Sequence, residues 1–118
     1  MATISLNKEQ FFKKVGEKAS GSSVFEFLGR KPAVIDFYAE WCQPCRMVAP
    51  VIEELSETFD GKVDFYKVNV DEENELSALF DIRSIPTLLF VTAGGEVRRY
   101  TGAVPRARLK ELVLELFE

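Results

Sequence analysis

The sequence contains no histidine and only two cysteines among its 118 residues. A structural zinc site usually takes four Cys or His ligands, so a metal site here would require carboxylates or a second chain. A chain of this length buries roughly two thirds of the surface that its unfolded form exposes, and it can fold without metals or disulfides. We therefore expect a single domain over residues 1–118, with no metal ligands.

An excess of charge of one sign is also missing. The 19 acidic and 15 basic residues are scattered along the chain and give a net charge of −4. No basic stripe suggests nucleic acid, and no polybasic helix suggests an anionic membrane. No stretch approaches the roughly 20 apolar residues of a membrane span. We expect protein or small-molecule partners, with no nucleic acid and no membrane.

The first residues, MATISLNKEQFFKKV, do not have the basic start, apolar core and small-residue cleavage site of a signal peptide. We therefore expect a cytoplasmic location. A static disulfide is disfavoured in such a reducing compartment.

Apolar patterns of two periods alternate along the chain. Residues 33–39 (AVIDFYA) form a nearly continuous apolar run, which is typical of a strand covered on both faces. Apolar residues at spacings of three and four predict helices over 43–59, with Pro50 inside, and from Pro105 to Phe117. Segment 16–32 has the weakest pattern: KASGSS predicts a loop, and VFEFLG predicts a short extended piece or a turn. The other expected elements are a strand over 4–6, a helix capped by Asn7 and Gln10, a strand over 63–70, a short helix through 76–80, and hairpin strands over 87–92 and 96–101.

This order of elements predicts an α/β fold. Strands that alternate with helices favour a mainly parallel sheet with helices on both faces, and the terminal hairpin adds an antiparallel edge. Reactive sites of such sheets lie beyond the carboxyl ends of the strands. Residues 41–45 fall at that place, directly after the AVIDFYA strand.

Both cysteines lie in the stretch WCQPC, residues 41–45. A disulfide that closes so small a loop restrains the unfolded chain little. Cys42 falls at a helix start, where unpaired amides and the helix dipole favour a thiolate. Cys45 lies one turn further and can attack a disulfide formed at Cys42, while Pro44 fits the first turn. The motif predicts redox chemistry, with a structural disulfide and a metal site as weaker alternatives.

WCQPC within DFYAEWCQPCR resembles the active-site motif of the thioredoxin family, whose usual form is WCGPC. The resemblance continues through KVNVDE, the step Ile85-Pro86-Thr87, the turn at Gly94, the TGA at 101–103 and the final helix. It implies the thioredoxin fold, with a central mixed five-stranded sheet and helices on both faces. It also implies a thiol–disulfide oxidoreductase that reduces disulfides in protein substrates.

The resemblance implies separate roles for the two cysteines and for a partner. Cys42 would be the nucleophile and Cys45 the resolving thiol. A separate thioredoxin reductase would hold NADPH and FAD and restore the dithiol, since this sequence has no GxGxxG segment for them. We expect no bound cofactor and a monomeric protein.

Asp36 is the single charged residue of the AVIDFYA run. Burial of a carboxylate is unfavourable and raises its pKa, and the resemblance implies that Asp36 assists proton transfer at Cys45. Lys67 shares strand parity with Val63 and Phe65, so its ammonium is expected to approach Asp36 and moderate its charge. The alternatives are a surface carboxylate and a lysine without catalytic effect.

A flat apolar surface around Cys42 is also implied by the resemblance. Pro86 would be the family's cis-proline, and the Ile85 backbone would pair with an extended substrate segment. For Pro86 a simple strand boundary is the alternative, and for Trp41 simple packing. The residues expected to bind substrate are Trp41, Gln43, Pro44, Ile85, Pro86, Gly102 and Ala103.

Three residues depart from the family's pattern. Gln43 replaces the usual glycine, Tyr38 stands where tryptophan is common, and Arg46 replaces a common lysine. Gln43 carries neither charge nor imidazole, so we expect a reductant with a modestly changed potential. The alternative functions are a non-catalytic binding or scaffold subunit and an oxidase or isomerase of exported proteins.

Overall fold

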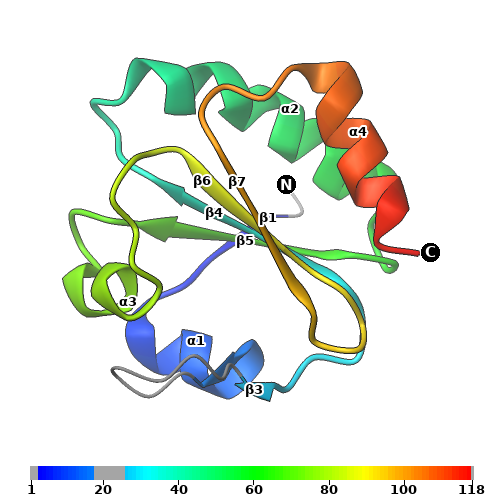
Figure 1. Ribbon diagram of the computed structural model, residues 1–118, viewed down its shortest axis with the longest axis horizontal. Helices are drawn as coiled ribbons and strands as arrows, with labels where there is room; N and C mark the ends of the chain where they lie inside the picture. The colour runs from blue at the N-terminus through cyan, green and yellow to red at the C-terminus, as the bar shows by residue number, and fades with distance from the viewer. Residues whose placement is uncertain (1–2, 18–25, 118) are drawn as a thin grey trace.

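The computed structural model describes residues 3–17 and 26–117 and arranges them around a central sheet (Figure 1). Most elements lie within a residue or two of their predicted positions. In chain order they are β1 (Thr3–Ser5), α1 (Lys8–Lys14), β2 (Gly16–Glu17), β3 (Glu26–Phe27), β4 (Ala33–Tyr38), α2 (Gln43–Thr58), β5 (Asp64–Asn69), α3 (Asn74–Leu79), β6 (Thr87–Val91), β7 (Val97–Thr101) and α4 (Arg106–Glu115).

The central sheet has five strands in the order β1-β5-β4-β6-β7. Strand β5 pairs in parallel with β1 and β4, whereas β6 is antiparallel to both β4 and β7. The sheet is therefore mixed, as the family resemblance implied: β1, β5 and β4 form the parallel part, and the terminal hairpin adds the expected antiparallel edge, with β6 antiparallel to β4 as well.

The length of α3 explains why β6 is antiparallel to β4. Its six residues span about 9 Å, whereas a strand of six residues is about 20 Å long. So short a helix does not carry the chain back across the sheet, and β6 starts at the edge where β5 ends. The first residue of β6, Thr87, accordingly pairs with Phe37 near the end of β4.

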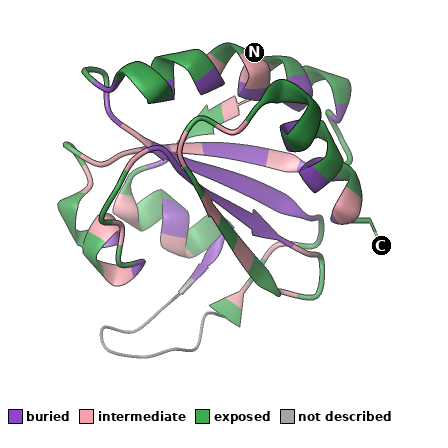
Figure 2. Cartoon of the chain, turned by 45° about the horizontal axis from the view of Figure 1, so that its top comes forward, coloured by how far each residue is buried: buried purple, intermediate pink, exposed green. Residues whose placement is uncertain are grey.

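Helices cover both faces of the sheet: α2 and α4 lie on one side, and α1 and α3 on the other (Figure 1). The side chains of β4 alternate between the two cores. Val34 packs with residues of α2 and α4, and Ile35 and Phe37 pack with residues of α1 and α3. Strands β4 and β6 are almost entirely buried (Figure 2), which explains the continuous apolar run of β4.

Local helix signals are confirmed at both ends of the chain. The Asn7 side chain accepts from the Gln10 amide at 2.9 Å, and the Gln10 side chain accepts from the Asn7 amide at 3.1 Å, which forms the predicted capping box. Pro105 is the N-cap residue of α4 rather than its first residue. The predicted stripe is buried up to Leu116, but Phe117 lies beyond α4 and is 50% exposed, stacked on Phe59.

The weakly patterned segment contains a small second sheet, in which β2 and β3 pair antiparallel. Residues 26–27 of VFEFLG are therefore extended, one of the two expected forms, while the KASGSS loop prediction lies outside the described residues. None of the helices within 3–17 and 26–117 has the length and apolar character needed to cross a bilayer.

Candidate redox site

Cys42 and Cys45 lie at the N-terminus of α2, immediately beyond the end of β4. Cys42 is the N-cap residue, and its Sγ accepts a hydrogen bond from the Cys45 amide at 3.2 Å. The two sulfurs form a disulfide bond, with the Cα atoms 5.2 Å apart. Pro44 lies in the first turn, as predicted, where its missing N–H leaves no hydrogen bond unmade. The hydrogen bond from the Cys45 amide and the positive end of a 16-residue helix both favour a thiolate at Cys42.

A loop from the other half of the sheet lies against Cys42. The carbonyl oxygen of Ile85 is 3.8 Å from Cys42 Sγ, and the Ile85–Pro86 peptide bond is cis. The Gly102 amide donates to the Pro86 carbonyl at 2.9 Å. Gly102 has a φ of 86°, a backbone region that favours glycine. Three predicted site residues that are distant in sequence are thus brought together beside the disulfide.

Trp41 is 70% exposed, so simple packing into the core does not describe it. Its indole Nε1–H donates to the Asp71 carboxylate at 2.8 Å, and the Asp71 amide in turn donates to the Asn69 side chain at 3.0 Å. Asp71 was not among the site residues predicted from the sequence. The available signal was its place in KVNVDE, directly beyond a strand that ends at the edge carrying the cysteines.

The remaining predicted surface residues are accessible. Gln43 and Pro44 are exposed on the first turn of α2, and Ala103 is exposed after β7. Together with Trp41 they leave an open surface beside the disulfide, while both cysteine side chains are at most 4% exposed.

Asp36 is the buried acid of the site. It is 1% exposed, and its Oδ1 has no hydrogen-bond partner within the part of the chain that the structure describes. Burial raises the pKa of Asp36 from 3.8 to about 7, and the positive charge of Lys67 acts in the opposite direction. The alternative of a surface carboxylate is therefore wrong.

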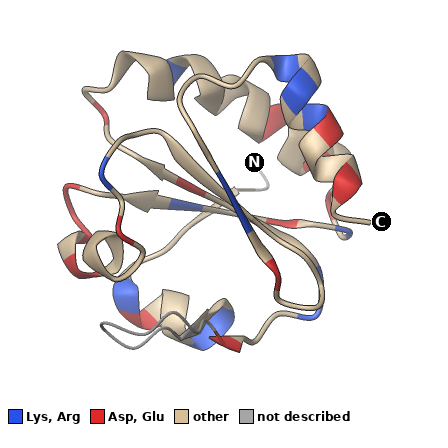
Figure 3. Ribbon diagram, in the orientation of Figure 1, with Lys and Arg blue, Asp and Glu red and all other residues tan. Residues whose placement is uncertain are grey.

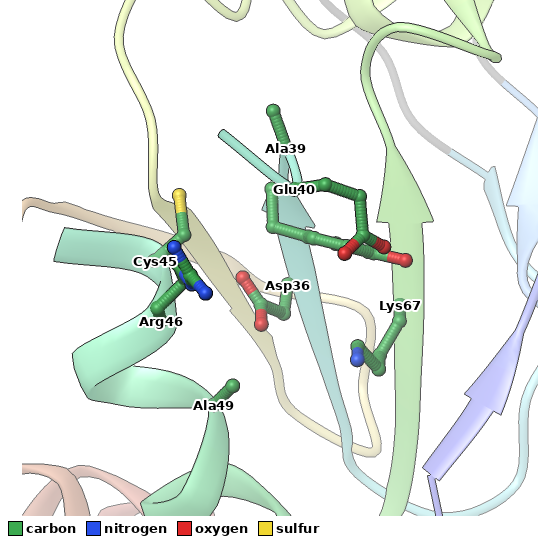
Figure 4. A pocket seen from close by; sticks show the side chains of 8 residues that line it. Asp36, Ala39, Glu40, Cys45, Arg46, Ala49 and Lys67 are labelled. Carbon is green, nitrogen blue, oxygen red and sulfur yellow. The ribbon is translucent and has the colours of Figure 1, made fainter. Parts of the chain in front are cut away.

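A pocket of about 90 Å³ joins this acid to the second cysteine (Figure 4). The close-up shows Cys45 and Arg46 from α2 on one side of Asp36 and Lys67 from β5 on the other. Lys67 is the direct partner of Asp36 in the register of β4 and β5, as strand parity predicted. The residues that line the pocket are Asp36, Tyr38, Ala39, Glu40, Cys45, Arg46, Ala49 and Lys67.

No group of three or more metal-ligating side chains occurs among residues 3–17 and 26–117. Lys and Arg positions alternate with Asp and Glu positions along the ribbon in Figure 3.

A cysteine pair joined by a disulfide at a helix N-terminus, with a buried carboxylate beside it, defines a dithiol–disulfide oxidoreductase. Comparison with known proteins leads to the same class. The family model described as Thioredoxin matches residues 2–115. The chain therefore belongs to the thioredoxin family, which confirms the predicted fold and the predicted thiol–disulfide oxidoreductase activity.

Individual relatives support this assignment. The thioredoxin of Borreliella burgdorferi is 36% identical over 114 residues, which cover 97% of this chain and 97% of that protein. Thioredoxin 1 of Nostoc sp. is 45% identical over 80 residues, 68% of this chain and 75% of the relative. The chloroplastic M-type thioredoxin of Pisum sativum is 48% identical over 82 residues, 70% of this chain and 48% of the relative.

Proposed function

We propose that the chain reduces disulfides in protein substrates, with Cys42 as the nucleophile and Cys45 as the resolving thiol. The different surroundings of the two sulfurs carry this proposal. Cys42 caps α2 beside the exposed Trp41, whereas Cys45 lines the pocket that contains Asp36. A thiolate is favoured at the first position, and a proton acceptor is available at the second.

The exchange would proceed in two displacements. The Cys42 thiolate attacks one substrate sulfur, the substrate S–S bond breaks, and the other substrate sulfur leaves as a thiolate that takes up a proton. Cys45 then loses its proton toward Asp36 and attacks the Cys42 sulfur, which releases the second substrate sulfur. Two electrons pass to the substrate, and the Cys42–Cys45 disulfide forms.

Asp36 suits proton transfer near neutral pH because burial raises its pKa to about 7. In this proposal Lys67 modulates Asp36, since its positive charge opposes the effect of burial.

The substrate would lie on the open surface around Cys42. The Ile85 backbone, 3.8 Å from Cys42 Sγ at its carbonyl oxygen, would pair with an extended segment that contains the substrate cysteine. The proposed substrate-binding residues are Trp41, Gln43, Pro44, Ile85, Pro86, Gly102 and Ala103.

Family membership implies disulfide-containing substrates and a recycling reductase in general terms. We propose specifically a thioredoxin reductase that carries NADPH and FAD, so that this chain binds no cofactor. We further propose that residues 1–118 act as one monomeric domain in the cytoplasm, in electron transfer that maintains cell redox homeostasis.

The test is reduction of insulin disulfides driven by NADPH and thioredoxin reductase. The wild-type chain should turn over, and the Cys42→Ser/Cys45→Ser double variant should not. Cys45→Ser should trap covalent substrate complexes through Cys42, whereas Cys42→Ser should trap none. Absence of turnover by the wild type would favour the scaffold function, and equal trapping by both single variants would contradict the assigned roles.

The redox equilibrium with glutathione tests the effect of Gln43 separately. We expect a reducing potential, because Gln43 adds no charge between the cysteines. A potential close to that of protein disulfide isomerase, about −180 mV, would favour the oxidase or isomerase function instead.

A further inference from the structure

The ammonium of Lys67 lies over an aromatic ring although a carboxylate is its direct neighbour in the sheet. Asp36 and Lys67 face each other on β4 and β5. No ion pair joins them among the described residues. Lys67 Nζ instead lies 4.5 Å from the centre of the Tyr38 ring. The lysine therefore makes a cation–π contact in place of a salt bridge.

Tyr38 is held in this position by the strand that bears Asp36. The two residues are separated by one position on β4, so their side chains leave the same face of the sheet. Tyr38 pairs with Asn69 in the register of β4 and β5. The ring and Asp36 line the same pocket as Lys67.

We propose that the Tyr38 ring holds the Lys67 ammonium away from the Asp36 carboxylate, which makes Tyr38 a positioning residue of the proton-transfer site. The attraction between an ammonium and a ring is stronger where both are partly removed from water, as at this half-buried pair. Without the ring, the flexible lysine stem reaches the carboxylate on the neighbouring strand. The functional consequence rests on the role of Asp36 proposed above.

Other groups around the pocket do not replace Lys67 in this arrangement. Lys67 is the cation whose charge lowers the pKa of Asp36, against the larger effect of burial. Glu40 and Arg46 line the pocket but are exposed to solvent, and Leu88, opposite Asp36 on β6, is apolar. The groups that face Asp36 or Tyr38, besides Lys67 and Asn69, are Glu40, Cys45, Arg46, Glu72 and Leu88.

The experiment is an NMR titration of the Asp36 carboxyl carbon in the oxidised full chain, in which the two cysteines are bonded and do not titrate. Tyr38→Leu should lower the pKa of Asp36 by about one unit or more, because a cation brought close to a carboxylate has an effect of that size. Tyr38→Phe keeps the ring and should leave the pKa of Asp36 within a few tenths of the wild-type value. Lys67→Met should raise it.

The double variant distinguishes an effect of the Lys67 charge on the pKa of Asp36 from an effect of water that reaches Asp36. If removal of the ring acts through Lys67, Tyr38→Leu should lower the pKa of Asp36 much less in the Lys67→Met background. An equal decrease in both backgrounds would mean that the ring only excludes water, and this would overturn the proposal. No decrease in either background would overturn it too.

A measurement on the wild-type protein keeps the proposal testable if Tyr38→Leu does not fold. Protons next to an ammonium that lies over a ring are shifted upfield, so the Lys67 ε-methylene signals should be upfield of those of exposed lysines. Random-coil shifts would contradict the proposed contact. Neither measurement requires redox activity, and failure of insulin reduction would therefore bear on the proposed function alone.

Discussion

Asp36 is expected to make the folded protein less stable as the pH rises from about 4 to about 7. The carboxyl is 1% exposed, and burial raises its pKa from 3.8 to about 7. Between these values the folded state keeps a proton that the unfolded chain has released, so each increase in pH favours unfolding. The destabilisation is absent at a pH below the pKa of Asp36 in the unfolded chain, and it is complete at a pH above the pKa of Asp36 in the folded protein.

The size of the effect follows from the two pKa values. One pKa unit corresponds to 1.36 kcal/mol, so an increase from 3.8 to about 7 corresponds to about 4 kcal/mol. This is a large part of the roughly 5–15 kcal/mol that stabilises a typical domain. Asn cannot ionise, so Asp36→Asn should gain about 4 kcal/mol in unfolding free energy, relative to wild type, between pH 4 and pH 8.

Urea unfolding of the oxidised protein at intervals from pH 4 to pH 8 measures this difference. The change with pH is the test, because any cost of placing an amide in the same buried site contributes at every pH. Asp60→Asn is the matched control: this exposed carboxylate lies in solvent, so its variant should follow the pH dependence of the wild type. Parallel curves for wild type and Asp36→Asn would show that Asp36 does not keep its proton in the folded state above pH 4.

Three further predictions concern contacts around the site and at the first helix. Arg99 donates to the carbonyls of Phe80 and Asp81, the latter at 3.2 Å, and so holds the segment that leads from α3 to Pro86. Arg99→Met should therefore lower the urea unfolding free energy by about 1–2 kcal/mol, and an unchanged urea midpoint would contradict this. Trp41→Phe removes the 2.8 Å hydrogen bond to Asp71 and should raise KM for insulin several-fold with at most about 1 kcal/mol lost in stability, whereas an unchanged KM would argue against a substrate contact. Asn7→Ala removes the cap of α1 and should lower the urea unfolding free energy by about 1 kcal/mol; a value equal to that of the wild type would contradict this prediction.

The features that could be predicted from the sequence are those encoded over a few neighbouring residues. The capping box at Asn7 and the helix start at Cys42 depend on residues three positions apart. The AVIDFYA run identified the central strand because a strand buried on both faces has no polar side to mark. Asp36 is the one charged residue of that run, and its burial could be predicted because both faces of the strand are covered; the structure confirms its burial.

Contacts between distant segments were harder to predict. Asp71 reaches Trp41 across the edge of the sheet, and nothing near Trp41 in the sequence indicates this partner. The small sheet of β2 and β3 also escaped prediction, since strands of two residues carry no periodicity.

Local signals are enough to locate the reactive pair, because a buried strand followed by WCQPC places both cysteines at a helix N-terminus. The surroundings of that pair depend on how distant segments pack together. The short α3 sets the direction of β6, and β6 begins where Ile85 and Pro86 meet Cys42. Strand parity placed Lys67 beside Asp36, but the position of its ammonium depends on a ring that shares the pocket, because a flexible side chain takes the most favourable partner that the fold offers.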